Sequence, residues 1–225
     1  NNGTYYDYQI NFTTFNVKKF NTNITANVTT PIKYGETLFI NVTVNETATG
    51  FIAININGTI GVAYIKDGIA KFSIGGLAPG NYSNIRLTYY PDTPFFNGNV
   101  TNITFRVDPT DKYTIDVKVE DIEYRQNATV RVLVATDAVG NVAIYVDGKN
   151  MGTVNLTKGV AVLGNITGLA GGRHVVNVTY NGGPRYSPKD KNNTFFMVNP
   201  TDNWDMSITA EYKPSSCFLA SSFSK

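Results

Sequence analysis

Cysteine and histidine are nearly absent from this chain of 225 residues, which contains one of each, Cys217 and His174. A lone cysteine cannot form a disulfide within one copy of the chain, and it rules out a cysteine-based metal site. A single histidine cannot by itself supply a histidine-containing metal cluster or a nucleophile–base pair. The motifs G-x-S-x-G, H-E-x-x-H and the P-loop are missing as well. We therefore expect that the chain is not an enzyme.

Charge is also sparse. Charged residues make up 16% of the chain and the formal net charge is +2, so no electrostatic pattern points to nucleic acid or to an anionic membrane. The sequence contains no apolar run of about 18 residues, and its first ten residues lack the charged and apolar regions of a secretory signal. We expect no nucleic-acid partner and no membrane insertion of this segment.

Asparagine and threonine are abundant instead, each at about one residue in eight, beside 14 tyrosines and 13 phenylalanines. Threonine, aromatic and β-branched residues suit a pleated, half-buried surface, whereas long helices favour other residues. Apolar and polar residues alternate with period 2 through most of the chain, which places them on opposite faces of strands. The clearest examples are residues 23–29, 38–44, 51–57, 114–120, 128–134 and 141–147. The sequence predicts an all-β protein.

The chain repeats itself with an offset of about 90 to 92 residues. FRVDPTDKYTIDV at residues 105–117 recurs as FMVNPTDNWDMSI at 196–208, and IKYGET at 32–37 recurs as IEYRQN at 122–127. Hairpin turns are indicated at matching places by Asn57-Gly58 and Asp147-Gly148, because both pairs tolerate the positive φ of type I′ turns. The sequence therefore predicts a cut from an array of repeats. We expect these units: 1–18, the end of a preceding repeat; 19–109, repeat 1; 110–200, repeat 2; and 201–225, the start of a following repeat plus an unmatched tail.

Seven short strands in about 90 residues are typical of an immunoglobulin-like sandwich. The predicted fold is therefore tandem immunoglobulin-like antiparallel β-sandwiches, joined end to end as a rod. This fold often carries a tyrosine corner, in which a hydroxyl bonds back to the preceding turn. Tyr82 stands at that position in repeat 1, and His174 takes its place in repeat 2. The predicted core comprises Ile40, Val42, Val44, Ile52, Ile54, Ile56, Phe72, Ile74 and Leu87 in repeat 1, and Val130, Val132, Val134, Val142, Ile144, Val146, Val162 and Val178 in repeat 2.

The repeats resemble the bacterial Ig-like repeats of adhesin-like cell-surface proteins, as found in methanogenic archaea. The resemblance extends from Thr30 to Val198 and is carried by YGET, FINVTVN, GFIAINING, VAYIKDGIAKFSIGGLAPGNY, LTYYPD and ITFRV in repeat 1. Repeat 2 departs from the pattern at EYRQN and at His174, and the tail EYKPSSCFLASSFSK fits no part of it. The resemblance implies an extracellular array displayed at the cell surface that serves attachment or carries an attachment tip.

Three functions remain open from the sequence. In the first, the repeats are a structural stalk that supports attachment to other cells or surfaces, with neighbouring repeats of the same chain as partners. In the second, the repeats themselves bind glycan or protein on a partner cell, because faces rich in amide, hydroxyl and tyrosine groups can bind sugars. An exposed cluster of aligned tyrosine or tryptophan rings would favour this second function. In the third, the repeats accompany a secreted polysaccharide-degrading enzyme.

Fifteen N-x-[ST] triplets are present, far more than random placement of these residues would give. One interpretation is N-glycosylation of an exported glycoprotein. The other is sheet geometry, because asparagine and threonine two positions apart both point outward from a strand and form such triplets automatically. The candidate sites are Asn23, Asn27, Asn41, Asn45, Asn57, Asn81, Asn99, Asn102, Asn127, Asn155, Asn165, Asn177 and Asn192, with Asn2 and Asn11 in the preceding segment.

The predicted junctions between repeats contain Asp108, Asp111 and Asp202. These carboxylates are weak candidates for calcium ligands that would stiffen an array, although the oxygens are few and no D-x-D-x-D run accompanies them. The alternative is a proline-stiffened linker with no cofactor. An internal lysine–asparagine crosslink is a further hypothesis for Lys118, but its alternation with Val117 and Val119 predicts a solvent-facing lysine.

Overall fold

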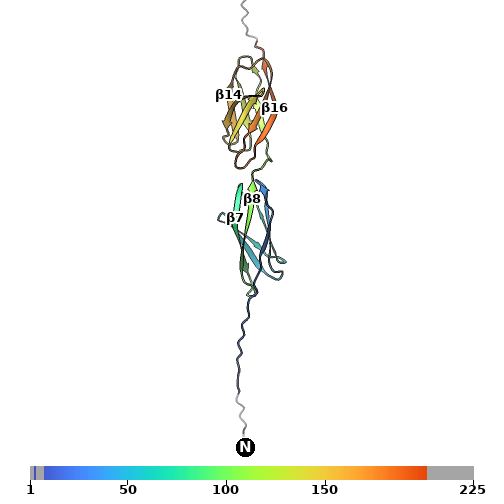
Figure 1. Cartoon of the computed structure of the whole chain (residues 1–225), viewed down its shortest axis with the longest axis vertical. Helices are drawn as coiled ribbons and strands as arrows, with labels where there is room; N and C mark the ends of the chain where they lie inside the picture. Colours follow the sequence, from blue (N-terminus) through green and yellow to red (C-terminus); the bar gives the residue numbers. More distant parts are fainter. Residues whose placement is uncertain (1–2, 4–7, 202–225) are drawn as a thin grey trace, which may run out of the picture.

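The computed structural model describes Gly3 and residues 8–201, and all regular secondary structure in this part of the chain is β. Figure 1 shows two lobes stacked along one long axis, with a short connection between them and an extended N-terminal segment below the first lobe. None of the described residues forms a helix that is long and apolar enough to cross a membrane. The prediction of an all-β chain made of two sandwiches is confirmed.

Repeat 1 consists of a three-stranded sheet packed against a five-stranded sheet. The smaller sheet has the order β1-β3-β6: β1 (Thr25–Val28), β3 (Leu38–Thr43) and β6 (Ile69–Ile74). The larger sheet has the order β2-β8-β7-β4-β5: β2 (Ile32–Lys33), β8 (Asn99–Asp108), β7 (Gly80–Pro91), β4 (Gly50–Ile56) and β5 (Thr59–Tyr64). This order is that of an immunoglobulin-like sandwich.

Repeat 2 has the same topology. Its three-stranded sheet has the order β9-β11-β14: β9 (Asp116–Val119), β11 (Ala128–Leu133) and β14 (Val160–Ile166). Its five-stranded sheet has the order β10-β16-β15-β12-β13: β10 (Ile122–Glu123), β16 (Lys189–Asn199), β15 (Gly172–Tyr180), β12 (Asn141–Val146) and β13 (Lys149–Asn155). The strands of the two repeats thus lie within residues 25–108 and 116–199, while the boundaries at 18, 109 and 200 stay predictions.

The expectation of seven strands in each repeat, all antiparallel, was wrong in one detail. The first strand is split, so that β1 pairs with β3 in one sheet while β2 pairs in parallel with β8 in the other. In repeat 1 the break lies at Pro31, which has no N–H to donate to a ladder. The strand changes sheets there, and its second half reaches the end of the sandwich that faces repeat 2. Repeat 2 has the same split between β9 and β10 without a proline, so Pro31 is compatible with the split but is not required for it.

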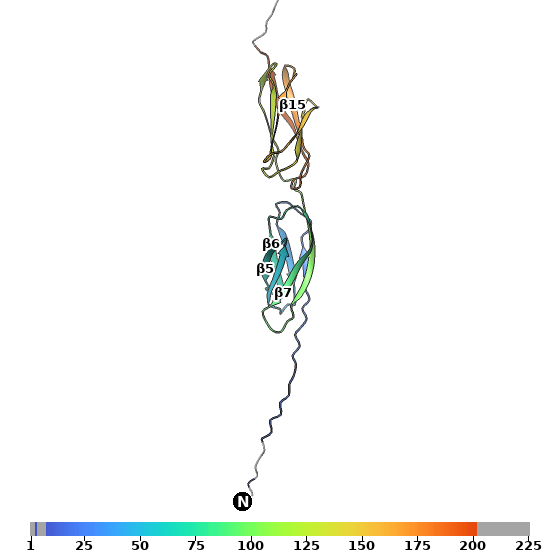
Figure 2. The ribbon, with the colours of Figure 1, turned by 90° about the vertical axis from the view of Figure 1, so that its left-hand side faces the viewer.

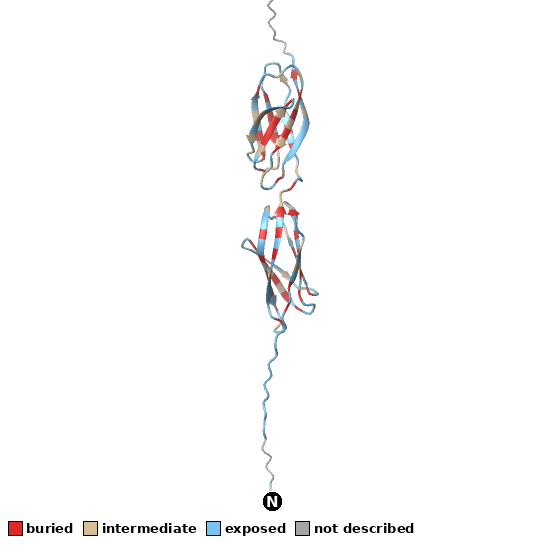
Figure 3. Cartoon of the chain, viewed as in Figure 1, coloured by how far each residue is buried: buried red, intermediate tan, exposed pale blue. Residues whose placement is uncertain are grey.

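Each repeat has one core, formed by the residues of its strands that are buried between the two sheets. Figure 3 shows these buried residues interspersed with exposed ones along the strands. Burial confirms the predicted core except at three positions: Ile74 and Val134 are half-buried, and Val162 is 48% exposed. Val162 lies opposite Arg131, whereas its neighbour Ala161 lies opposite Val132 and is buried. A register shift near the end of β14 inverts the alternation, because one irregular residue reverses which side chains face the core.

The predicted hairpin turns are present. Asn57 and Asp147 both have a φ of 49°, and each is followed by a glycine with positive φ. Two consecutive residues of positive φ are what a type I′ turn requires. The same local chemistry therefore joins β4 to β5 and β12 to β13.

Candidate functional site at the junction between the repeats

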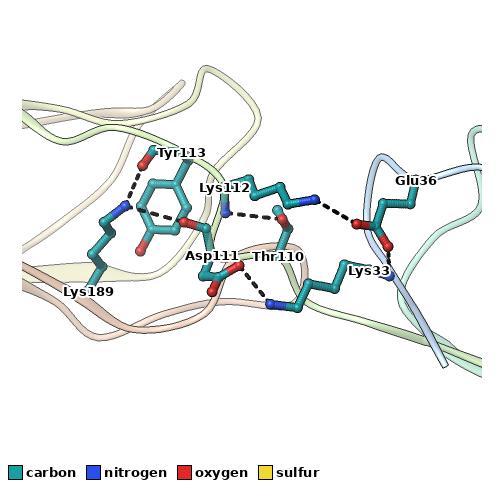
Figure 4. Close-up of polar contacts among 7 residues, drawn as sticks. All are labelled: Lys33, Glu36, Thr110, Asp111, Lys112, Tyr113 and Lys189. Atoms are coloured by element: carbon teal, nitrogen blue, oxygen red, sulfur yellow. Dashed lines mark hydrogen bonds and ion pairs between the residues drawn. The ribbon is translucent and has the colours of Figure 1, made fainter.

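The junction brings the turn after β2 of repeat 1 against two loops and the first residues of repeat 2. Figure 4 shows the polar part of this contact, with Lys33 and Glu36 on one side and residues 110–113 on the other. The loops of repeat 2 are those between β11 and β12, which contains Asp137, and between β15 and β16. The turn of repeat 1 that contacts repeat 2 is closed by a hydrogen bond of 2.9 Å from the Glu36 amide to the Lys33 carbonyl.

Two ion pairs cross the junction. Lys33 Nζ lies 2.8 Å from Asp111 Oδ1, and Lys112 Nζ lies 2.8 Å from Glu36 Oε1. The hydrogen bond from Lys33 lowers the pKa of Asp111, and the hydrogen bond from Lys112 lowers the pKa of Glu36. Each repeat contributes a cation to one pair and an anion to the other. All four side chains are partly exposed, and salt screens such pairs.

Tyr34 enters repeat 2. Its hydroxyl donates to Asp137 Oδ2 at 2.9 Å, while Tyr186 donates to Asp137 Oδ1 at 2.6 Å and Arg185 lies 3.0 Å from Oδ2. The ring of Tyr34 meets that of Tyr186 edge-on with centroids 5.8 Å apart, and the guanidinium of Arg185 lies 5.5 Å from the Tyr34 ring centroid. We call Asp137, Arg185 and Tyr186 the tyrosine socket. Tyr34 thereby packs against the core of repeat 2.

The protonation states in the socket suit this arrangement. The hydrogen bond from Tyr186 is the main cause that lowers the pKa of Asp137, so Asp137 is a carboxylate acceptor at neutral pH. The hydrogen bond to Asp137 raises the pKa of Tyr34, and burial raises the pKa of Tyr186 to about 12. Both phenols are therefore protonated donors. One carboxylate accepts from two phenols and one guanidinium, which fixes the position of Tyr34.

The linker is itself anchored to repeat 2. The Thr110 amide donates to the Arg185 carbonyl and the Ser187 amide donates to the Thr110 carbonyl, each at 3.0 Å, and Thr110 is 5% exposed. Lys189 Nζ donates to the Tyr113 carbonyl at 2.6 Å (Figure 4). The chain therefore leaves β8 and is fixed on repeat 2 within two residues.

The carboxylates considered for calcium have other partners. Asp108 pairs with Arg106 at 2.8 Å, Asp111 pairs with Lys33, and Asp202 lies outside the described residues. In residues 8–201 no group of three His, Cys, Asp or Glu side chains could hold a metal ion. Lys33 thus pairs with Asp111, one of the carboxylates that the sequence suggests as calcium ligands, and calcium binding stays a hypothesis.

The predicted corner positions make comparable bonds. Tyr82 donates its hydroxyl to the Ala78 carbonyl at 2.9 Å, and His174 places Nε2 2.8 Å from the Ala170 carbonyl. His174 also places Nδ1 2.6 Å from Asp147 Oδ2. The bond to the Ala170 carbonyl is the main cause that raises the pKa of His174, with Asp147 adding to it. In repeat 2, therefore, a histidine that pairs with a carboxylate replaces the tyrosine of the corner, and we call this arrangement the ionic corner.

The candidate glycosylation asparagines are exposed with one exception, Asn177, which is half-buried and accepts a hydrogen bond from the Asn193 amide at 3.0 Å. The side chain of Asn99 is also engaged, because its Nδ2 donates to the Thr22 carbonyl. Asn2 lies outside the described residues, and glycosylation itself stays a prediction. Lys118 is 67% exposed at its side chain and faces solvent, unlike the buried lysine that a crosslink needs.

Sequence reasoning missed two features. The first is the socket, for which the recurrence of tyrosine in IKYGET and IEYRQN was the available sign. The second is an aromatic cluster on the outer face of repeat 1, made of Phe51, Tyr64 and Tyr90. Phe51 and Tyr90 stack with centroids 5.1 Å apart, and Tyr64 meets Phe51 edge-on at 6.1 Å. Tyr64 is 79% exposed.

Comparison with known proteins adds little beyond the fold. No protein-family model and no curated protein matches the sequence. Among solved structures, the chain is similar to fibronectin(III)-like modules of Clostridium thermocellum CbhA, with 15% identity, a TM-score of 0.32, and 83% of this chain and 100% of that chain covered. It is also similar to the human OSCAR ligand-binding domain, with 11% identity, a TM-score of 0.31 and coverage of 80% and 99%. A biofilm-associated protein BSP domain gives 19% identity, a TM-score of 0.29 and coverage of 78% and 30%. Scores this low carry no argument about function.

Proposed function

We propose that the chain is a segment of an extracellular, adhesin-like cell-surface protein, in which these repeats form a structural stalk that supports attachment to other cells or surfaces. The observation that carries the proposal is the insertion of Tyr34 into the tyrosine socket of the next repeat. A junction held in this way converts two small sandwiches into one rod. No catalytic role is proposed, and the absence of enzyme activity stays a prediction, because a sandwich fold does not exclude catalysis.

The physical reason is that a stalk needs reach. Two domains joined by a short linker move relative to each other unless the interface between them is substantial. Here the linker is hydrogen-bonded to repeat 2 at Thr110, two ion pairs join Asp111 and Lys112 to the turn after β2, and Tyr34 is held in the tyrosine socket. Stacked repeats that keep a constant angle add their lengths along one direction. The junction therefore serves the mechanical task of holding an attachment site away from a surface.

Small-angle X-ray scattering of the described two-repeat chain tests this proposal. The variants are Tyr34→Ala and, as a matched control, Tyr124→Ala, which removes the corresponding tyrosine at the far end of repeat 2. We expect the wild type and the control to give the same maximum dimension and a narrow distance distribution between lobes. Tyr34→Ala should broaden that distribution. If the distance distribution of the wild type is as broad as that of Tyr34→Ala, Tyr34 does not hold the two repeats at a fixed angle, and the stalk loses its mechanical basis.

A second candidate function is that the repeats themselves bind glycan or protein on a partner cell. The aromatic cluster favours it, because exposed and mutually oriented rings offer a large apolar surface with polar ends. The test is binding of the folded chain to whole microbial cells and to a glycan panel, with and without calcium. Saturable binding that Tyr64→Ala abolishes supports it. If the folded chain binds neither the cells nor the glycans, the stalk is the only one of the two functions that remains.

We also propose that several exposed sequons carry N-glycans in the native protein, with an archaeal source as the accompanying expectation. The support is that twelve of the thirteen candidates between residues 23 and 192 are exposed. Mass analysis of peptides from the native protein tests this. Unmodified asparagine throughout would leave sheet geometry as the explanation of the triplets.

A further inference from the structure

The β5 strand of repeat 1 is an open edge. It pairs with β4 on one side and is the last strand of its sheet. Its six residues, TIGVAY, carry no charge, and the outward side chains of Ile60, Val62 and Tyr64 are 68%, 51% and 79% exposed. An edge strand presents a row of backbone donors and acceptors, and natural proteins usually protect it with charge, a bulge or a cover. This edge has neither a charge nor a bulge within the strand.

The corresponding edge of repeat 2 is protected. Its edge strand β13 begins with Lys149, and its pairing with β12 shifts register between Ile144 and Tyr145. Gly152 in the same strand has a φ of 150°. The β4–β5 register, by contrast, is unbroken from Phe51 opposite Tyr64 to Ile56 opposite Thr59. Bulges and charges of this kind prevent edge-to-edge pairing, and the same scaffold has them in one repeat and lacks them in the other.

The outer face of the sheet beside this edge is also more apolar in repeat 1 than in repeat 2. The aromatic cluster of repeat 1 spans β7, β4 and β5, since Phe51 lies opposite both Tyr64 and Tyr90. In repeat 2 these positions are asparagines: Asn141 lies opposite Asn155 and bonds to Asn181. The fold therefore does not require aromatic residues there. An apolar strip in repeat 1 runs from β7 across β4 to the free edge of β5.

Candidate glycans would leave this strip open. None of the sequon asparagines lies within β4 or β5, and the nearest, Asn57, is in the turn between them. In repeat 2 the edge strand β13 ends in the sequon Asn155, and β15 contains the sequon Asn177. A glycan at Asn155 would lie on the edge strand of repeat 2, whereas the edge strand of repeat 1 contains no sequon.

We propose that β5 pairs antiparallel with β5 of a second copy of this chain, so that the two five-stranded sheets become one. The uncharged strand is self-complementary about a twofold axis at Val62, which places Ile60 opposite Tyr64 of the partner and keeps all outward pairs apolar. An isologous contact of this kind closes after two copies and cannot extend into a fibre. Backbone hydrogen bonds supply affinity and the cross-strand pairs supply register, as in other cases of strand addition.

The orientation of the strands gives this pairing a functional consequence. Figures 1 and 2 show that the strands of repeat 1 run roughly along the long axis of the molecule. Antiparallel pairing of β5 therefore points the two rods in opposite directions, as rods do when they project from two facing surfaces. The inference rests on the second candidate function and names its partner as an identical chain on the other cell. Binding through several such contacts in an array would gain strength from multivalency.

Sedimentation equilibrium of the full chain, with Cys217 kept reduced, tests the pairing. We expect a monomer–dimer equilibrium in the wild type. Val62→Lys and Val62→Glu, each alone, place like charges opposite each other and should weaken dimerisation at least tenfold, whereas their one-to-one mixture should restore it. Thr153→Lys makes the same change on the edge of repeat 2 and should have no effect. Because Val62 points outward, circular dichroism of both Val62 variants should match the wild type.

The outcomes separate the alternatives. A wild-type chain that stays monomeric up to millimolar concentration overturns the proposal, as does dimerisation that survives Val62→Lys. A monomeric chain that binds glycans through Tyr64 overturns it in favour of a sugar ligand. Scattering from the dimer should show a maximum dimension longer than that of the monomer, and an unchanged dimension contradicts antiparallel pairing. None of these results affects the fixed angle between the repeats, so failure of the pairing is distinguishable from failure of the stalk.

Discussion

The hydroxyl of Tyr34, in repeat 1, lies 2.9 Å from Oδ2 of Asp137, in repeat 2. This contact joins residues 103 positions apart in the sequence and places a side chain of one sandwich against the core of the next. The pairing of β2 with β8 makes the contact possible. Because β2 runs parallel to β8, the turn after β2 lies at the end of the sandwich where the chain passes into repeat 2. The junction is therefore part of the fold of both repeats.

The ion pairs across the junction predict a charge-swap result. Lys112→Glu should place two carboxylates together at Glu36 and widen the distribution of distances between spin labels in the two repeats. The double variant Glu36→Lys with Lys112→Glu should narrow it again, because the pair is restored with the charges exchanged. Pulsed electron resonance measures this distribution. A single variant with the wild-type distribution would show that the pair does not constrain the junction.

The two cores should unfold independently. Leu87 is fully buried in repeat 1, and Leu87→Ala should destabilise that repeat by about 2–5 kcal/mol through lost transfer energy and the cavity that remains. Repeat 2 should lose much less stability, because Leu87 is absent from its core and repeat 1 contributes only Tyr34 to the margin of that core. Calorimetry should show one transition moving to lower temperature. Val162→Ala, at an exposed position, is the control and should move neither transition.

The corner bond of Tyr82 predicts a smaller effect. Tyr82→Phe removes the donor to the Ala78 carbonyl but keeps the ring that stacks on Phe105 with centroids 4.6 Å apart. The loss should be about 0.5–1.5 kcal/mol, which is typical for one intramolecular hydrogen bond. Chemical denaturation monitored on repeat 1 measures it. A loss of several kcal/mol would mean that the hydroxyl has a role beyond this bond.

The ionic corner of repeat 2 predicts a pH dependence that repeat 1 lacks. The pKa of His174 is raised in the folded state, mainly by the Ala170 carbonyl and further by Asp147. A raised pKa means that the stabilisation is fully present below the unfolded value of about 6.5 and is lost as pH rises through the folded value. The melting temperature of repeat 2 should therefore fall between mildly acidic and mildly basic pH.

His174→Tyr is the matched control for this pH dependence, because it introduces the residue found in repeat 1. Its melting temperature should be flat over the same pH range. A slope that persists in His174→Tyr would assign the effect to another group.

The sequence was sufficient for the fold because its evidence is local and repeated. Period-2 alternation identified the strands, Asn57-Gly58 and Asp147-Gly148 identified hairpins, and the repeat identified two copies. Val162 was misplaced because one irregular residue in β14 reverses the inner and outer faces, and alternation counted from Ile166 cannot detect it. The split of the first strand was missed because sheet exchange depends on pairing partners.

The junction could not be predicted for a different reason. Asp137 and Tyr186 lie in loops, and only the three-dimensional structure shows that both face Tyr34. The aspartates of the linker suggested oxygen ligands for a calcium ion. In the structure Asp111 instead pairs with the ammonium group of Lys33. The aromatic cluster likewise depends on register across three strands.

Residual dipolar couplings of the two-repeat chain test the central claim most directly, because they compare the alignment of the two repeats in one sample. Couplings from both repeats should fit one alignment tensor in the wild type, whereas Tyr34→Ala should require two tensors of different magnitude. If the wild type itself requires two tensors of different magnitude, the repeats move independently, and the junction is a flexible linker that does not hold a rod.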